Sequence, residues 1–292
     1  MKNIFFLSSC LLLLYCQQDP SSNNDIKTRD LNTPITIVKP PKLVNPTGNT
    51  IVNRFSPPPN SERIASKDTS SFAYYLQHLP LKPDGSEVLY YNGNTKPNNG
   101  IYKAVVDLPI GKKDLHQCAD AIMRLRAEHL FKQKAYKQIQ FNFTNGFPVN
   151  YSIWKQGNRV VVNGNKTYWK AKTTPSNSYK NFWAYLETIF TYAGTYSLSK
   201  ELKPIVVENM EIGDVFIQGG FPGHAIIVVD MAVHPDTGAS LFMVAQSYMP
   251  AQELQVLSNP QEATISPWYR CNFGETLITP EWEFSKDDLK RF

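Results

Sequence analysis

A thiol, an imidazole and a carboxamide occur in the order Cys118, His224, Gln246 and form the strongest candidate chemical group in the sequence. Cys118 lies near the start of a predicted helix, where aligned backbone amides can lower the pKa of a thiol. His224 opens one apolar run and Gln246 follows another. An imidazole that an amide orients can take the proton of a cysteine nucleophile. The pattern therefore predicts nucleophilic catalysis by Cys118, with His224 as base.

Two other interpretations of Cys118 remain open. Cys118 belongs to the apolar stripe of its predicted helix, and buried free cysteines commonly serve as small core residues. Cys271 is the other cysteine of the predicted domain, and a disulfide between the two in an exported protein would remove the nucleophile.

Further polar residues surround the candidate nucleophile in the sequence. Asp120 and Arg124 either reach the site as part of a polar network or form ordinary ion pairs on the helix surface. His116 and His129 are spaced too irregularly with respect to acidic residues for a zinc site. No Gly-rich phosphate loop precedes a helix. We predict no metal and no cofactor.

A predicted β-hairpin brings His224 and Gln246 together. Its two strands are the apolar runs 225–229 and 241–245, and the turn His-Pro-Asp-Thr-Gly-Ala separates them. In an antiparallel pair the start of the first strand lies beside the end of the second. A third strand is predicted just upstream, at Gly-Asp-Val-Phe-Ile from residue 213.

A helix is predicted from Asp114, as its N-cap, to about Tyr136, because apolar residues recur there at a helical period. The remaining elements are predicted as helices at 70–79, 179–192 and 195–202, strands at 87–91, 103–108 and 139–143, and an aromatic tail that packs over the sheet. These elements indicate one α+β domain over residues 61–292, in which the long helix packs on an antiparallel sheet.

The chain begins with a predicted export signal at residues 1–16, where Lys2 precedes an apolar stretch too short to span a bilayer. Cys16 ends that stretch and is the predicted lipidation site, which would make the lipid bilayer a partner; an ordinary signal peptide with an incidental cysteine is the alternative. Residues 17–60 are rich in Pro, Ser and Asn and are predicted to be a disordered tether.

Composition bounds the function only loosely. The 292 residues are 42% hydrophobic and 19% charged, as is usual for a globular protein. The net charge is +5, and the sequence contains no block of like charges, so we predict no nucleic-acid partner.

The segments GHAIIVVD and LFMVAQSYMP resemble the His and Asn strands of papain-like cysteine peptidases. Gly-Asp-Val-Phe at 213–216, Gly-His-Ala at 223–225 and Gln-Cys-Ala at 117–119 are similar to motifs of the bacterial cell-wall cysteine hydrolases. The resemblance implies a papain-like arrangement, with Cys118 as nucleophile, His224 as base, Gln246 as orienting amide and Gln117 beside the site. Gln246 stands where those enzymes carry Asn or an acid, and Lys112 stands at the spacing of their oxyanion glutamine.

A narrower resemblance covers the chain from about residue 54 to its end. The blocks DLHQCADAIMRLRAEHL, YAGTYSL, GDVFIQGGFPGHAIIVVD, AQSYMPAQ and TPEWEF resemble those of an uncharacterised bacterial lipoprotein family, domain of unknown function 4846. This resemblance implies an exported, membrane-attached protein of the bacterial cell envelope and no particular activity.

Two functions are expected from these patterns. The first is a cysteine-dependent amidase or peptidase that acts on amide or peptide bonds at the cell envelope, for instance in cell-wall peptides. The second is a non-catalytic envelope lipoprotein in which Tyr248, Trp268 and Trp282 beside His224 bind a peptide or a glycan.

Overall fold

The computed structural model describes residues 42–164 and 166–292. The predicted export signal at residues 1–16, with its lipidation site Cys16, lies outside the described residues, as does the first part of the predicted tether. Within the described part of the chain, no helix has the length and apolarity that crossing a membrane requires.

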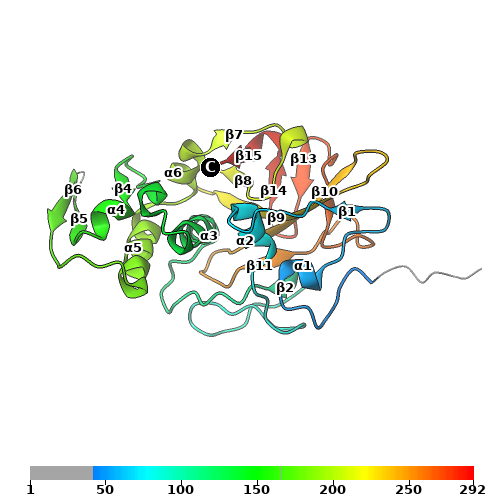
Figure 1. Cartoon of the computed structure of the whole chain (residues 1–292), viewed down its shortest axis with the longest axis horizontal. Helices are drawn as coiled ribbons and strands as arrows, with labels where there is room; N and C mark the ends of the chain where they lie inside the picture. Colours follow the sequence, from blue (N-terminus) through cyan, green and yellow to red (C-terminus); the bar gives the residue numbers. More distant parts are fainter. Residues whose placement is uncertain (1–41, 165) are drawn as a thin grey trace, which may run out of the picture. The chain divides into compact units, whose positions relative to one another are not determined.

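A nine-stranded sheet forms the centre of the domain (Figure 1), and its strand pairs are antiparallel. Its main path runs β2 (Tyr102–Val105), β11 (Gln255–Leu257), β10 (Ser240–Gln246), β9 (His224–Val233), β8 (Val215–Gln218), β15 (Leu289–Arg291) and β7 (Lys203–Pro204), while β1 (Glu62–Arg63) also pairs with β9 and β12 (Tyr269–Arg270) with β10. The predicted hairpin is confirmed as β9 and β10, and the predicted third strand as β8.

The side chains of strand β9 alternate between the two faces of the sheet, and this alternation shifts by one residue partway along the strand. Ala225 and Ile227 belong to one buried apolar cluster, and Ile226 and Val228 to the cluster on the opposite face. The register with β10 shifts next to Val228, as in a β-bulge, and the alternation of side chains is reset there. His224 and Asp230 therefore point to opposite faces although both positions are even-numbered.

Helix α3 (Cys118–Lys132) packs on β9, and its buried residues join the cluster of Ala225 and Ile227. The predicted start at Asp114 is wrong. The Asp114 carboxylate accepts hydrogen bonds from the Gln117 side chain and the Ala251 backbone, and the capping position belongs to Gln117. The helix ends before Lys134, whose φ of 57° is left-handed.

The other helices are α1 (Ile51–Arg54), α2 (Phe72–Gln77), α4 (Tyr151–Trp154), α5 (Tyr179–Tyr192) and α6 (Thr195–Glu201). Three of them confirm predicted helices, namely α2, α5 and α6. Ser71 caps α2 and Ser178 caps α5, because each side chain accepts a hydrogen bond from the backbone three residues on. The predicted α+β class is confirmed, but α3 is preceded by two short helices.

Three small hairpins complete the domain: β3 (Gln140–Asn142) with β4 (Pro148–Asn150), β5 (Asn158–Asn163) with β6 (Lys166–Ala171), and β13 (Thr276–Ile278) with β14 (Glu283–Ser285). The aromatic tail packs over the sheet as predicted, since Phe284 and Leu289 belong to the same cluster as Ile226. The predicted strand at 87–91 is wrong, because only isolated bridges form there.

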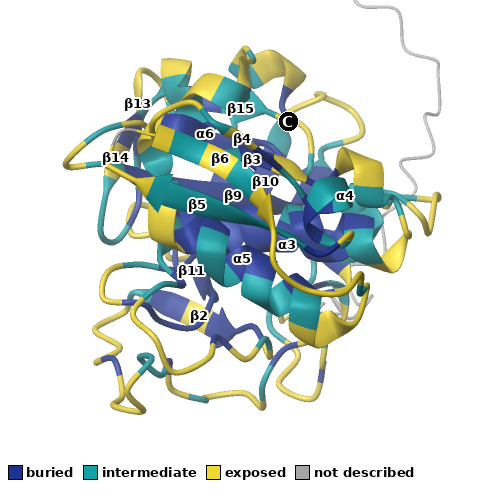
Figure 2. Cartoon of the chain, turned by 90° about the vertical axis from the view of Figure 1, so that its left-hand side faces the viewer, coloured by how far each residue is buried: buried dark blue, intermediate teal, exposed yellow. Residues whose placement is uncertain are grey.

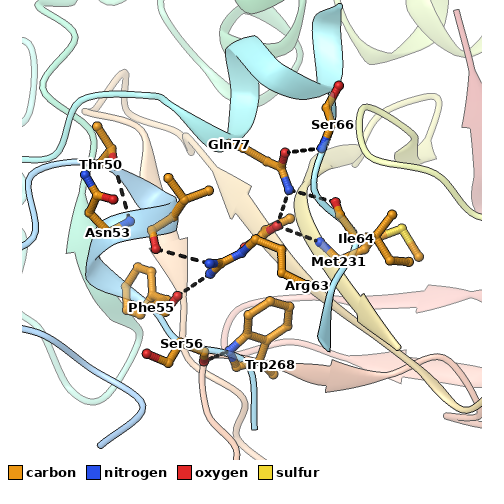
Figure 3. A network of polar contacts seen from close by, with 12 residues as sticks. Thr50, Asn53, Phe55, Ser56, Arg63, Ile64, Ser66, Gln77, Met231 and Trp268 are labelled. Carbon is orange, nitrogen blue, oxygen red and sulfur yellow. Dashed lines mark hydrogen bonds and ion pairs between the residues drawn. The ribbon is translucent and has the colours of Figure 1, made fainter. Parts of the chain in front are cut away.

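The folded domain begins earlier than the predicted boundary at residue 61. Ile51 and Phe55 are fully buried in the main cluster. Arg63 fixes this segment to the sheet: its guanidinium bonds the Asp230 carboxylate at 2.8 Å and the backbone carbonyls of Val52 and Phe55 (Figure 3). A Pro-rich composition therefore did not prevent residues 51–60 from folding.

Candidate active site

A cavity of about 410 Å³ lies where the N-terminus of α3 meets the start of β9. Its walls come from four regions of the sequence: the start of α3, the junction of α5 and α6, the loop 220–223, and the aromatic residues that follow β10 and precede β14. Of the predicted site residues, Gln117, Cys118, Asp120, His224 and Tyr248 line this cavity.

Cys118 is the first residue of α3 and is half-buried. The backbone N–H of Ala225, the residue after His224, lies within hydrogen-bonding reach of its sulfur. Burial raises the pKa of the thiol to about 11, and the negative charge of Asp120 adds to this effect, while nearby backbone N–H groups oppose it. The lowered pKa that the helix terminus predicted is wrong, because burial outweighs the helix field.

His224 is buried, and its imidazole lies 2.8 Å through Nε2 from Oε1 of Gln246. The predicted contact between these two residues is confirmed. Burial lowers the pKa of His224 to about 4, and the charge of Lys96 lowers it further, although the bond to Gln246 acts in the opposite direction. The ring is therefore neutral at physiological pH and able to accept a proton.

Two charged residues fix the orientation of Gln246. Its Nε2 donates to Oε2 of Glu281 at 2.6 Å, and the Lys96 ammonium donates to the same oxygen at 2.6 Å. An ionised carboxylate only accepts hydrogen bonds, so the amide must turn its NH₂ toward Glu281 and its oxygen toward His224. Nε2 of His224 is then the protonated nitrogen, and Nδ1 keeps the free lone pair.

Aromatic rings enclose the imidazole on several sides. The ring centroids of Tyr248, Trp282 and Phe284 lie 4.6, 5.3 and 5.8 Å from that of His224. Together with the surrounding chain, these rings bury the imidazole. Trp282 and Tyr248 also line the cavity, so they present apolar surface to anything bound there.

Asp120 and Gln117 lie at the N-terminus of α3. The Gln117 backbone N–H donates to Oδ2 of Asp120 at 3.0 Å, while Oδ1 has no hydrogen-bond partner among the described residues. Burial raises the pKa of Asp120 well above its usual value. The negative charge of Asp120 disfavours ionisation of the Cys118 thiol.

Arg124 and Trp268 do not contribute to the cavity, contrary to the prediction. The Arg124 guanidinium donates to the Pro109 carbonyl at 2.8 Å and lies over the Trp183 ring. Trp268 has no exposed surface, and its indole N–H donates to the Ser56 carbonyl. Both side chains are held by the interior of the domain.

Sequence reasoning missed Lys96 and Glu281, which control Gln246, and Phe221 and Met249, which form the exposed rim of the cavity. Phe221 is 97% exposed and Met249 is 58% exposed, although both are apolar. The Phe-Pro-Gly sequence before His224 signalled a turn at the first of these positions. No local pattern singles out Lys96.

The charged side chains among the residues that line the cavity are Asp114 and Asp120, with no Lys or Arg. Within the described ranges, no three His, Cys, Asp or Glu side chains are arranged to hold a metal ion. Cys118 and Cys271 are both free, so the disulfide left open by the sequence is not formed.

Comparison with known proteins identifies a family but no characterised relative. The sequence model of domain of unknown function 4846 matches residues 51–291, which span most of the chain. No curated protein and no solved structure matches. The match begins at α1 and so agrees with the early start of the folded domain. The chain therefore belongs to the domain of unknown function 4846 family.

Proposed function

We propose that this protein is a cysteine-dependent hydrolase that cleaves amide or peptide bonds at the bacterial cell envelope, where lipidation of Cys16 anchors it to the membrane. The observation that carries the proposal is the oriented imidazole of His224, whose free Nδ1 belongs to a ring on the same cavity as the Cys118 thiol. Sequence anatomy supports export, since an apolar stretch after Lys2 ends at Cys16.

In the proposed reaction the Cys118 sulfur attacks the carbonyl carbon while its proton passes to Nδ1 of His224. The carbon–sulfur bond forms and the carbonyl oxygen becomes an oxyanion. When the carbon–nitrogen bond breaks, the imidazolium gives its proton to the departing amine. Water, deprotonated by His224, then hydrolyses the thioester and releases the acid and the thiol.

The proton transfer accompanies the attack rather than preceding it. A thiol with a pKa of about 11 and an imidazole with a pKa of about 4 are both neutral at physiological pH. A preformed thiolate–imidazolium pair is therefore not the ground state of the free protein. Nδ1 acts as a general base, because Gln246 holds the ring in the required tautomer.

Donors for the oxyanion are found at the start of α3. The first backbone N–H groups of a helix lack intrahelical acceptors and are oriented toward negative charge. The N–H of Cys118 is one such group, and the Gln117 side chain, which lines the cavity, offers an amide donor. Lys112 does not take this role, because its side chain is exposed and outside the lining.

The papain-like arrangement is part of this proposal. A thiol at the first turn of a helix that packs on an antiparallel sheet, with the imidazole at the entrance of a strand and an amide at the exit of the next, agrees with it. The residues that line the cavity also restrict the class of substrate. Because the lining contains the acidic residues Asp114 and Asp120 and no Lys or Arg, the cavity disfavours an anionic segment beside the scissile bond.

The test is release of primary amines from purified cell-wall peptides and from an unrelated peptide mixture. We expect release by the wild-type protein and none by Cys118→Ala, which removes one half-buried sulfur and leaves the fold intact. Equal release by both proteins, or no release from either substrate by the wild type, would remove the proposal.

A second candidate is the non-catalytic lipoprotein that binds an envelope peptide or glycan. The raised pKa of Cys118 favours it, because an inert thiol needs no activation, and the rings of Tyr248 and Trp282 offer stacking surfaces. Calorimetry with the same cell-wall peptides separates the two. If the wild-type protein binds these peptides without releasing amines, and Trp282→Ala weakens the binding, the protein is the non-catalytic lipoprotein.

A further inference from the structure

The positive charge of the folded domain is concentrated in one segment and is not spread along the chain. Residues 130–186, named here the basic segment, contain nine Lys and Arg and no Asp or Glu. The rest of the described residues contain 17 Lys and Arg against 22 Asp and Glu, a net charge of −5. A net charge of +9 therefore lies on one part of a domain that is otherwise acidic.

The basic segment forms one contiguous region built around α4, the first half of α5 and the hairpins β3–β4 and β5–β6 (Figure 1). Ten ion pairs occur among the described residues, and none involves a cation of this segment. Nine of the 17 cations elsewhere do form ion pairs. The charge of the basic segment is thus left without internal compensation.

The hairpin β5–β6 presents this charge on one face. Lys166, Tyr168 and Lys170 alternate along β6 and are exposed, and Lys172 follows them, also exposed (Figure 2). The intervening Trp169 packs against the core. We call the four exposed residues, Lys166, Tyr168, Lys170 and Lys172, the cationic face.

The cationic face is not explained by stability. Lys170 pairs directly with Arg159 across the hairpin, and like charges in such a position disfavour pairing of the strands. Tyr168 is 46% exposed between two lysines, although an aromatic ring gains stability from burial. Uncompensated cations around an exposed aromatic ring are the composition that binds the headgroup layer of a bilayer.

We propose that the cationic face docks on a bilayer of anionic phospholipids, with the lysines on the phosphates and Tyr168 at the headgroup level. This contact is independent of the proposed hydrolase activity and of an acyl chain on Cys16.

Two observations favour a bilayer over a nucleic acid. Eight of the nine cations of the basic segment are lysines, which act as mobile point charges, whereas bidentate phosphate recognition favours arginine. The one arginine, Arg159, is already bonded to the Trp154 carbonyl and the Asn181 side chain. The segment therefore carries diffuse charge, as a fluid anionic surface requires.

The test is co-sedimentation of the full chain with vesicles of phosphatidylcholine and phosphatidylglycerol, and with vesicles of phosphatidylcholine alone. Every protein carries Cys16→Ser, so that acylation makes no contribution. We expect binding to the anionic vesicles only, weakening as salt is added. The triple variant Lys166→Gln, Lys170→Gln, Lys172→Gln should lower the partition coefficient on the order of 100-fold, since each lysine near the surface contributes roughly fivefold.

The matched control is Lys67→Gln, Lys103→Gln, Lys203→Gln, which removes the same charge from exposed, unpaired lysines outside the basic segment. It should leave binding nearly unchanged. Equal losses in the two triple variants, or equal binding to both kinds of vesicle, would overturn the proposal. Displacement of the protein from vesicles by a DNA oligonucleotide at the same salt would assign the face to nucleic acid instead.

Discussion

Strand β9 carries a buried polar network at each end, and only one of the two opens on a cavity. Near its C-terminal end, Asp230 bonds Arg63 at 2.8 Å, Gln77 at 2.7 Å and the Met231 N–H at 3.0 Å (Figure 3). Both carboxylate oxygens have partners, and so does the amide of Gln77. This network is closed.

At the N-terminal end, Lys96, Glu281 and Gln246 form an equally buried chain that ends on His224. The chain leaves Nδ1 of that imidazole unused, beside a cavity that the Cys118 thiol shares. Buried charge alone therefore does not mark a functional site. A closed network holds the fold together, whereas a network with a free lone pair at a cavity has a group left over for chemistry.

The largest loss of stability is expected at the closed network around Asp230. Asp230→Asn leaves the Arg63 guanidinium without its carboxylate, and removing one partner of a buried ion pair costs about 3 kcal/mol in the free energy of unfolding. Urea denaturation measures the change. Asp236→Asn, in the exposed turn between β9 and β10, is the control and should cost little. Cys118 alkylation in the folded variant should keep its wild-type rate; a slower rate would mean that the two networks are coupled.

A smaller effect is expected at the open end, on reactivity rather than on folding. Glu281→Gln replaces an acceptor with a group that also donates, so Gln246 can turn its NH₂ toward His224 and spoil the tautomer. We expect alkylation of Cys118 at neutral pH to slow by roughly 100-fold, the size of a general-base contribution. Glu283→Gln is the control, because that side chain is exposed two residues away. Equal rates in the two variants would show that Glu281 does not set the tautomer.

The smallest expected effect concerns Asp120. Asp120→Asn removes the charge that disfavours the thiolate, so the pKa of Cys118 should fall. Burial, the larger cause, remains. Ultraviolet titration of the thiolate measures the shift, with Asp107→Asn as an exposed control. An unchanged pKa would mean that burial alone raises it.

Sequence patterns predicted the hairpin and the meeting of His224 with Gln246, because antiparallel pairing across a short turn is a local property. They misplaced the start of α3, since Asp114 looked like an N-cap while its carboxylate was used by Ala251, distant in the sequence. A long-range contact therefore outweighed the local capping preference of Asp114.

Other parts of the site depend on packing that no spacing reveals. Lys96 and Glu281 lie 185 residues apart and meet only because the tail folds back over the sheet. The direction of the Cys118 pKa shift was wrong because a helix terminus is visible in a sequence, whereas burial is not. Trp268 looked like a ligand-binding residue but is an interior one.

The role of His224 as the base for Cys118 can be measured through the pH dependence of Cys118 alkylation by iodoacetamide, in the wild type and in His224→Ala. Peptide mass spectrometry measures the extent of alkylation at each cysteine separately. Cys271 lies outside the cavity and serves as an internal reference, and burial raises its pKa to about 12. If His224 is the base, the wild-type rate rises as the imidazole loses its proton near pH 4 and then stays level until the thiol ionises near pH 11. In His224→Ala the level region should vanish, leaving a rate that climbs about tenfold per pH unit toward pH 11. Identical profiles in the two proteins would contradict the assignment of His224 as the base for Cys118.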